Sequence, residues 1–493
     1  MLFSSMTFLW IFLPLIIIVN YLINLLKIEY EIKIRIKNIF LLIFSLLFYG
    51  YGGFSYLCIM LILICINFIG GILISKKTFS VLRSFILTIV ISINLSVLFY
   101  YKYFNMIVII IEQILSKNGN LLYNLMYMKG TGSLGIKEIS LPIGISFFTF
   151  QAMSYVIDVY RNDAKPQSNI FNFALYVSFF PQLIAGPIVK YSDIEYQMKF
   201  RVENFAKFLI GQKRFIYGLA KKVILANTFA QIVDEIWKLD INTLGASVAI
   251  FGSFCYAMQI YYDFSGYSDM AIGLGKIFGF DFKENFNMPY MSKSVTEFWR
   301  RWHISLSTWF REYVYIPLGG NRKGKKRTYI NLFIVFLLTG IWHGANFTFI
   351  IWGLLYGIVL VVERKGFLNM LDNNKFKFIN WLYTITIVNL LWIIFRAPNI
   401  VLAMEYLKQF FNFSSNNSVF TYLSMKVIIV IIFSILCAGM VRLKFEKFYI
   451  RNIKYNNNLI LFTIDFLLQY VLLIYSILSL INGTYNPFIY FQF

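Results

Sequence analysis

The sequence is short of the residues that build disulfide frameworks, metal sites and acidic surfaces. Its 493 residues include four cysteines and two histidines, and no Cys-x-x-Cys pair or Cys/His cluster occurs. We therefore expect neither a disulfide framework nor a bound metal. Acidic residues are also scarce, because 23 Asp and Glu stand against 45 Lys and Arg, which gives a formal net charge of +22.

Charge of either sign is sparse, and apolar residues dominate. Charged residues make up 14% of the chain and hydrophobic residues 59%, whereas soluble domains have about 25% and about 45–50%. This composition excludes an ordinary soluble domain and predicts an integral membrane protein in contact with membrane lipid. A basic chain can indicate a nucleic-acid partner, but here the basic residues form short runs between apolar stretches, as in cytoplasmic loops. We therefore expect no nucleic-acid partner.

Long apolar segments recur along the whole chain, and no polar stretch is long enough for a soluble domain. The sequence predicts a single all-α membrane domain, residues 1–493, with about ten to twelve transmembrane or re-entrant helices. The apolar run 7–26 lacks a basic start and a small-residue cleavage site, so we expect a retained first span. Residues 28–37 alternate apolar and charged side chains, which predicts a short interfacial strand.

Basic runs predict part of the topology. Runs 322–327, 364–377 and 442–454 should lie in the cytoplasm by the positive-inside rule. The apolar segment 328–362 then begins and ends on the same side. As a straight helix it would be about 52 Å long at 1.5 Å per residue, against a hydrocarbon core of about 30 Å. We therefore expect a bent or hairpin segment that enters and returns, and a C-terminal tail, 482–493, outside the cytoplasm.

His343 lies at the centre of this apolar segment, where an ionisable group is a functional candidate by default. Gly340 and Gly344 form a small-xxx-small pair that lets another backbone approach closely, and the glycines with Asn346 mark a helix break. The bland alternative is a neutral histidine that hydrogen-bonds a neighbouring helix. The position of one of only two histidines at the bend favours a functional role.

His303 is the second histidine, and an amphipathic pattern surrounds it. Ser294 and Glu297 have capping-box spacing, so a helix should begin there. The residues that share one face at i, i+3, i+4 spacing are Trp299, Trp302, His303, Leu306, Phe310 and Tyr313. The alternative is an interfacial helix with Trp and Arg anchors, which would still lie where an anionic cofactor or carrier arrives.

Four carboxylates lie in or beside apolar segments, namely Asp158, Asp263, Asp269 and Asp465. They could relay protons, but pairing with arginines or capping of helices is more usual. The sequence contains no H-E-x-x-H, no G-x-S-x-G and no P-loop, which disfavours several enzyme classes. A histidine in a membrane cavity remains, and it suits general-base activation of a hydroxyl.

Two long motifs carry a resemblance to a known family. They are FWRRWHISLSTWFREYVYIPLGGN at 298–321 and TGIWHGAN at 339–346. Both resemble the membrane-bound O-acyltransferase superfamily, in the branch of the alginate O-acetylation protein AlgI. Further matches occur at 141–151, 180–187 and 261–269, and the resemblance runs essentially along the whole chain.

The resemblance implies helices around a central catalytic tunnel in a bacterial cytoplasmic membrane enzyme. Such an enzyme takes an acyl group, usually acetyl, from a cytoplasmic thioester and passes it across the membrane to an exported polysaccharide. It commonly works through an extracytoplasmic SGNH-type partner. His343 matches the family's essential histidine and His303 its second common histidine. No bound cofactor is implied, and acetyl-CoA is the expected donor substrate.

The predicted topology assigns roles to the residues of these motifs. Arg300 and Arg301, with Trp302, are expected to bind the phosphate-bearing donor at a cytoplasmic entrance. His343 is expected to take a proton from the attacking hydroxyl. Three further residues are expected to line or support the tunnel, namely Trp342, Asn346 and Asp263.

The C-terminal residues 488–493, FIYFQF, resemble the acyl-transfer motif of bacterial envelope-acylating systems, in which a tyrosine is proposed to relay the acyl group. The resemblance makes Tyr490 the candidate relay. The alternative is an aromatic interfacial anchor.

Two other functions stay open at this level. One is transfer of a D-alanyl group from a carrier protein, within the same superfamily. The other is a non-enzymatic polysaccharide transporter, although no inverted repeat is visible. The acceptor is also open, because alginate, cellulose and peptidoglycan acetylation systems use similar membrane components.

Overall fold

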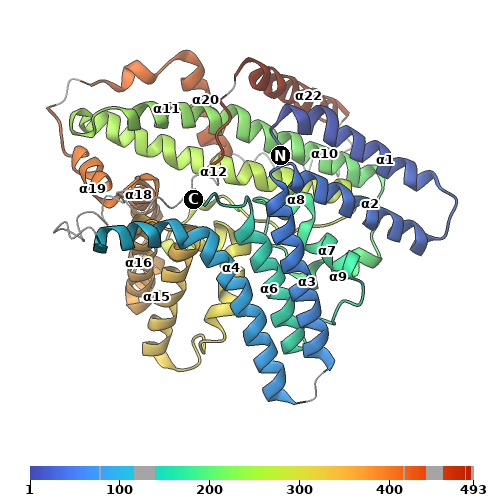
Figure 1. Ribbon diagram of the computed structural model, residues 1–493. Coiled ribbons are helices and arrows are strands. Elements are labelled where there is room, and N and C mark those ends of the chain that lie inside the picture. Colours follow the sequence, from blue (N-terminus) through green and yellow to red (C-terminus); the bar gives the residue numbers. More distant parts are fainter. Residues whose placement is uncertain (77–78, 116–138, 415–416, 440–458, 484, 490–493) are drawn as a thin grey trace. The chain divides into compact units, whose positions relative to one another are not determined.

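The structure is a computed structural model (Figure 1) that describes residues 1–76, 79–115, 139–414, 417–439, 459–483 and 485–489. Every regular element in these residues is helical, with no strand. The chain divides into two compact units. Unit 1 comprises Met1–Phe104, Ile139–Leu219 and Tyr267–Glu284, and unit 2 comprises Asn105–Glu138, Ala220–Gly266 and Asn285–Phe493. The single-domain prediction stays a prediction.

Unit 1 is built from long apolar helices that approach closely at glycine. Its elements are η1 (Phe8–Phe12), α1 (Leu13–Leu25), α2 (Tyr30–Gly50), α3 (Phe54–Lys76), the first part of α4 (Ser80–Leu115), α6 (Ile145–Arg161), α7 (Ile170–Ser178), α8 (Phe180–Leu183), α9 (Tyr191–Lys199) and α10 (Phe205–Ala220). A Cβ at Gly71 of α3 would lie 2.6 Å from the hydroxyl of Tyr155 in α6. Only glycine therefore allows this contact between α3 and α6, which lie side by side (Figure 1).

The strand predicted at residues 28–37 is wrong, because α2 is helical from Tyr30. Tertiary contacts override the alternating pattern. The hydroxyl of Tyr30 donates to the carbonyl of Arg201 at 2.9 Å. Lys37 is 2% exposed and its Nζ lies 2.5 Å from a carboxylate oxygen of Glu203. These contacts provide partners for polar side chains in the first turns of α2, so the helix continues from its polar start into its apolar second half.

Unit 2 surrounds an aromatic core. Its elements are η2 (Lys221–Ala226), α11 (Asn227–Lys238), η3 (Ile241–Thr243), most of α12 (Gly245–Ile277), η4 (Pro289–Met291), α13 (Val295–Arg301), α14 (Ile304–Phe310), η5 (Arg311–Tyr315), α15 (Gly324–His343), α16 (Phe347–Val362), η6 (Glu363–Phe367), α17 (Leu368–Asn373), α18 (Lys377–Arg396), α19 (Ile400–Gln409), η7 (Val419–Tyr422), α20 (Met425–Ala438) and α22 (Leu459–Asn482). Trp352 and Tyr356 are fully buried at its centre, with Trp299, Trp302 and Trp392 around them.

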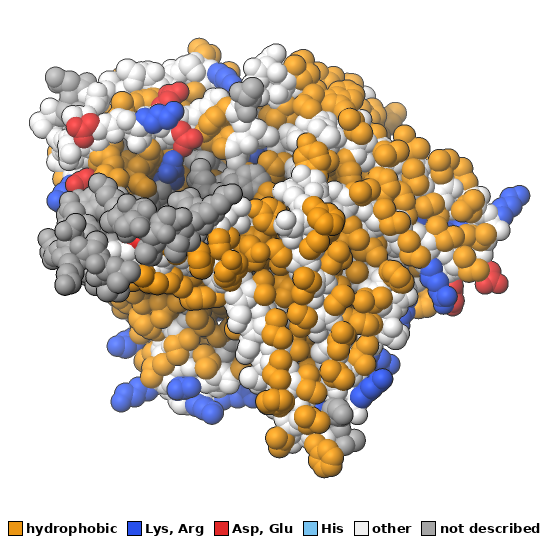
Figure 2. All heavy atoms as spheres, viewed as in Figure 1, with side chains coloured by type: hydrophobic (Ala, Val, Ile, Leu, Met, Phe, Trp, Pro, Cys, Tyr) orange, Lys and Arg blue, Asp and Glu red, His pale blue; other side chains and the backbone are white. Residues whose placement is uncertain are grey.

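Six helical segments of the described chain are long and apolar enough to cross a membrane: Phe8–Leu25, Phe54–Lys76, Ser80–Glu112, Phe347–Asn373, Lys377–Arg396 and Leu459–Asn482. Helix α20 is a shorter apolar helix. Hydrophobic side chains cover much of the visible face of α1, α2 and α3 (Figure 2), and Trp10, Tyr21 and Ile62 of these spans are each more than half exposed. Such a surface fits lipid, so the all-α multi-pass membrane class is confirmed.

The predicted break in segment 328–362 is confirmed. Helix α15 ends at His343, and α16 begins at Phe347 and packs antiparallel beside it (Figure 1). A Cβ at Gly340 would lie 2.4 Å from the carbonyl of Phe349, and one at Gly353 would lie 2.4 Å from the carbonyl of Phe336. Gly340 and Gly353 allow the backbones of the hairpin to touch. Gly340 belongs to the predicted small-residue pair, whereas its predicted partner Gly344 faces the side chain of Phe349 and Gly353 takes its place at the backbone contact.

Candidate active site

His343 is the last residue of α15 and is 8% exposed. Its ring meets three aromatic rings edge to face, with centroid distances of 5.0 Å to Trp342, 5.1 Å to Trp352 and 5.0 Å to Phe395. The backbone leaves the helix at Gly344 in an extended conformation. The imidazole is therefore held at the turn of the hairpin by rigid neighbours.

Asn346 fixes this turn from the other side. Its side-chain oxygen accepts a hydrogen bond from the backbone N–H of Thr348 at 3.0 Å and so caps α16. Its Nδ2 donates to the carbonyl of Pro398 at 2.8 Å. One amide thus ties the end of α15, the start of α16 and the segment after α18 together, three residues from His343.

The single helix predicted through His303 is wrong, although its predicted start is confirmed. The hydroxyl of Ser294 accepts from the backbone N–H of Glu297 at 3.0 Å, which begins α13. The helix ends at Arg301 because His303 adopts a left-handed conformation, φ 44° and ψ 54°. This region is costly for a residue with a Cβ. Trp302 is 4% exposed, so it is a core residue and not an interfacial anchor.

Asn285 holds the strained turn at His303. Its carbonyl accepts from the backbone N–H of Ile304 at 2.9 Å, and its Oδ1 accepts from both the backbone N–H and the hydroxyl of Ser305 at 3.1 and 2.9 Å. His303 is 4% exposed, and burial lowers its pKa to about 3, so the imidazole is neutral near pH 7. Its ring lies 6.4 Å from that of Trp342.

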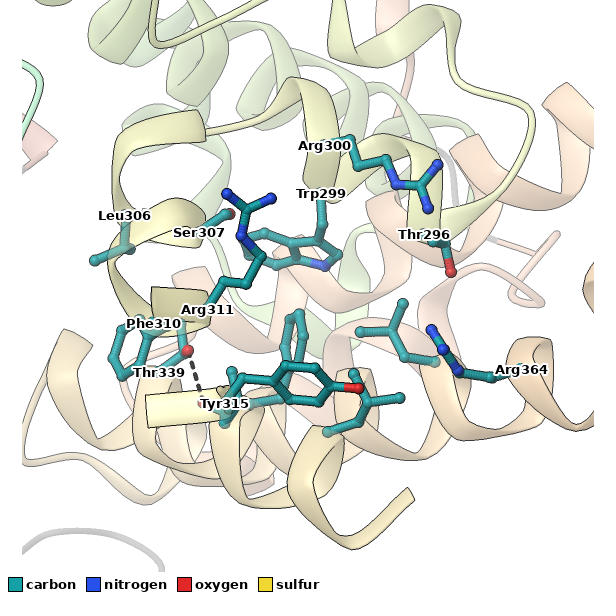
Figure 3. Close-up of a pocket in the computed structure, with 14 residues that line it drawn as sticks. Thr296, Trp299, Arg300, Leu306, Ser307, Phe310, Arg311, Tyr315, Thr339 and Arg364 are labelled. Carbon is teal, nitrogen blue, oxygen red and sulfur yellow. Dashed lines mark hydrogen bonds between the residues drawn. The ribbon is translucent and has the colours of Figure 1, made fainter. Parts of the chain in front are cut away.

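A cavity of about 260 Å³ opens between α13, α14, η5, α15, α16 and η6 (Figure 3). Three arginines line it, namely Arg300, Arg311 and Arg364. The indole of Trp299 forms part of the wall between them, and its buried Nε1 has no hydrogen-bond partner among the described residues. Thr339, one helical turn before His343, also lines the cavity. His343 itself is not a lining residue, so the two-sided tunnel stays a prediction.

The structure separates the three predicted donor-binding residues. Arg300 lines the cavity, but the guanidinium of Arg301 pairs with Glu297 at 2.7 Å. Trp302 stacks on Phe298 in the core, with ring centroids 5.4 Å apart. Arg311 and Arg364 share the cavity with Arg300 instead, and the sequence signal for them was their place in the motif 298–321 and the basic run 364–377.

Glu363 is a site residue that the sequence reasoning missed. It is fully buried and accepts from the backbone N–H groups of Val295 and Thr296 at 2.7 and 2.8 Å. It also accepts from the hydroxyls of Thr296 and Tyr383 at 2.6 and 3.2 Å. A carboxylate at the first turn of a helix satisfies its free N–H groups. Glu363 therefore positions α13, which carries Trp299 and Arg300. An acidic residue at the end of an apolar run was its signal.

Two of the four carboxylates singled out from the sequence, Asp263 and Asp269, have ionic partners, as the more usual interpretation predicts. Asp263 in α12 is 1% exposed, and its carboxylate lies 2.7 Å from Nζ of Lys222. Asp269 pairs with Arg214 at 2.9 Å.

The predicted relay residue, Tyr490, lies outside the described residues. No group of His, Cys, Asp and Glu suited to a metal occurs in the part of the chain that the structure describes.

The protein is therefore a helical membrane protein with a buried histidine at the turn of a helical hairpin. Residues 123–407, which include both histidines, match the family model of the membrane-bound O-acyltransferases (MBOAT). The chain belongs to this family, and it is an O-acyltransferase.

Relatives of known description share most of its length. The chain is 42% identical over 420 residues to the probable alginate O-acetylase AlgI of Pseudomonas aeruginosa, covering 84% of this chain and 76% of that protein. It is 37% identical over 516 residues to the probable alginate O-acetylase AlgI of Pseudomonas putida, covering 100% of both. It is 35% identical over 441 residues to the peptidoglycan O-acetyltransferase of Helicobacter pylori, covering 83% of this chain and 79% of that protein.

Proposed function

We propose that this protein moves an acetyl group from cytoplasmic acetyl-CoA across the bacterial cytoplasmic membrane for O-acetylation of an exported cell-envelope polysaccharide. The single observation that carries the proposal is His343 at the buried turn of the α15–α16 hairpin, within a chain whose relatives along most of its length are described as O-acetylases.

His343 acts as the general base. Its imidazole takes the proton of an attacking hydroxyl while the hydroxyl oxygen bonds to the thioester carbonyl carbon. The tetrahedral intermediate then expels the thiolate of CoA, which receives that proton, and an acetyl ester is formed. General-base catalysis of this kind contributes about 10²- to 10⁴-fold in rate. His303 stays neutral, and Trp342 lies beside both imidazoles.

The arginine-lined cavity receives the donor. Acetyl-CoA carries several phosphates, and guanidinium groups bind phosphate oxygens in a bidentate manner. A volume of about 260 Å³ is below the range of about 300–1,000 Å³ typical of sites that enclose a drug-sized ligand. The cavity therefore takes one part of the donor, with the unpartnered Nε1 of Trp299 as an additional donor to an anionic oxygen.

The acetyl group is transferred from CoA to the C-terminal tail. The hydroxyl of Tyr490 is the proposed attacking group, and its acetyl ester then passes to an extracytoplasmic SGNH-type partner that acetylates the polysaccharide. The support is the FIYFQF motif directly after the last apolar helix. Transfer from a D-alanyl carrier protein is less supported, because the relatives that match along most of the chain are described as O-acetylases.

Membrane vesicles with labelled acetyl-CoA test the proposal. We expect the wild-type protein to move label onto its own tail and then to the polymer, and His343→Ala to lower this transfer by about 10²-fold or more. Exposed Lys325→Ala is the matched control. Undiminished labelling by His343→Ala, at equal protein content in the membrane, would contradict the assignment of the base.

A further inference from the structure

The last described residues of the chain are buried, although they follow the final apolar helix. Phe488 is 3% exposed and Ile489 is 1% exposed. Ile489 belongs to the same core cluster as Phe349 and Phe395, and the rings of these two residues contact that of His343. Phe488 and Ile489 are therefore buried, and Ile489 belongs to the same core cluster of unit 2 as two aromatic neighbours of the candidate base.

A buried ion pair holds this segment by its backbone. Nζ of Lys222 lies 2.7 Å from one carboxylate oxygen of Asp263, and both side chains are 2% exposed. The other carboxylate oxygen accepts the backbone N–H of Ile489 at 2.9 Å. Nζ of Lys222 donates to the carbonyl of Pro487 and lies over the ring of Phe488, 5.8 Å from its centroid. Each member of the pair thus binds its partner and the tail.

The chemistry of this pair fits a dock better than a stabilising core contact. The cost of desolvating two charges usually offsets their attraction, so a buried pair adds little to stability by itself. Here each charge also makes a charge-assisted hydrogen bond to a peptide group, which is stronger than a neutral one. Lys222 lies in η2, a π-helical segment, and such segments are frequent at functional sites.

Flanking contacts fix the preceding residues. The hydroxyl of Tyr485 donates to a carboxylate oxygen of Asp234 at 2.5 Å, and the other oxygen of Asp234 pairs with Arg396 at 2.8 Å. Nδ2 of Asn227 donates to Oδ1 of Asn486 at 3.2 Å. Five consecutive residues, 485–489, are therefore held by side-chain contacts or burial.

We infer that Lys222 and Asp263 are positioning residues that dock residues 485–489 of the C-terminal segment in unit 2. The next residue in the chain is Tyr490, so the dock determines where the relay begins. This inference rests on the proposed relay for its role in catalysis, whereas the dock itself is a physical contact that can be measured without any activity.

Crosslinking measures the dock directly. Asn227→Cys and Asn486→Cys, in a chain whose four native cysteines are replaced by serine or alanine, place two thiols on opposite sides of the contact. A short, reducible bis-thiosulfonate crosslinker reaches further than a direct disulfide and can bridge them. We expect rapid bridging with Lys222 and Asp263 present. The double variant Lys222→Met/Asp263→Leu leaves no unpaired buried charge, and it should slow bridging about tenfold or more, because two charge-assisted hydrogen bonds to the tail are lost.

Transfer of acetyl to the extracytoplasmic acceptor provides the second readout. It should fall in the Lys222→Met/Asp263→Leu variant, return to near the wild-type rate once the 227–486 bridge has formed, and fall again on reduction. His343-dependent cleavage of the acetyl-CoA thioester with a small soluble hydroxyl acceptor should remain. Rescue by a bridge elsewhere in the contact is expected of a positioning role and not of a chemical one.

Bridging of the Lys222→Met/Asp263→Leu variant as fast as with the native pair would overturn the dock, and so would a bridged variant that does not regain transfer. The matched control is Lys37→Met, which removes one charge of another buried ion pair and leaves Glu203 paired with Arg201 at 3.2 Å. Slower 227–486 bridging in that control would assign the effect to general loosening and also overturn the dock. If no His343-dependent thioester cleavage occurs even in the wild type, the proposed function fails, and the bridging rates still decide the dock.

Discussion

The imidazole of His343 and the indole of Trp342 meet edge to face, with ring centroids 5.0 Å apart. The same indole lies 6.4 Å from His303, also edge to face. The two histidines of the chain therefore share one aromatic neighbour, although α14, η5 and α15 separate them in sequence.

The arginine-lined cavity predicts a donor-specific defect. Arg311→Ala and Arg364→Ala should each raise KM for acetyl-CoA about tenfold, because a charge-assisted contact to phosphate is lost, with a smaller change in kcat. Steady-state kinetics in vesicles measures the split. Arg301→Ala is the matched control, because that guanidinium pairs with Glu297. A thioester without phosphate, such as S-acetyl-N-acetylcysteamine, should be used equally well by Arg311→Ala and wild type. An equal loss with both donors would rule out phosphate binding in this cavity.

Tyr490→Phe keeps an aromatic ring and removes the hydroxyl. We expect loss of acetyl transfer to the extracytoplasmic acceptor, because no oxygen remains to carry the ester, while His343-dependent thioester cleavage with a small hydroxyl acceptor persists. Mass spectrometry of the C-terminal peptide should find acetyl on the wild-type tail alone. Tyr475→Phe is the control, since that tyrosine is exposed on α22 and lies before the docked segment. Full transfer by Tyr490→Phe would refute the relay and favour the interfacial anchor.

Gly340→Ala should separate the hairpin that carries His343. The added Cβ would lie 2.4 Å from the carbonyl of Phe349, which is backbone and cannot rotate away. Overpacking of this kind costs about 1–3 kcal/mol of folding free energy. The detergent-solubilised variant should therefore unfold at a lower temperature than the wild type. Gly357→Ala is the control on the same hairpin, because its Cβ first meets the side chain of Phe333 at 3.2 Å. Equal melting of the two variants would contradict the close-packing argument.

The buried imidazole of His303 predicts a direction of pH dependence. Burial lowers its pKa to about 3 in the folded protein, against about 6.5 in an unfolded chain. Between these values the unfolded state binds a proton that the folded state does not, so this residue makes stability fall as the pH drops below about 6.5. His303→Gln should melt with a weaker dependence on pH between 7 and 5 than the wild type. An unchanged slope would show that folding does not lower the pKa of His303.

The strand predicted at residues 28–37 was wrong because the alternating pattern is a local property and carries no information on distant contacts. Period 2 predicts a strand, but the polar side chains of this segment found partners far along the chain, such as Glu203 for Lys37. The helix at Ser294 was predictable because its cap is local, within three residues. Its end at Arg301 was not, since the left-handed turn at His303 depends on Asn285, which comes from a separate loop.

Composition, segment length and motifs were enough to predict a membrane protein, a segment 328–362 that turns back on itself, and two histidines within motifs that resemble those of an acyltransferase. Composition, helix length and charge bias are local properties. They predict membrane helices directly, because a bilayer requires apolar helices of sufficient length and favours basic loops in the cytoplasm. The folded structure was needed to show which three arginines share a cavity, that Glu363 positions α13, and that Lys222 and Asp263 bind the C-terminal segment. Buried charges must find partners wherever the fold brings them, and no spacing along the chain encodes which partner that is.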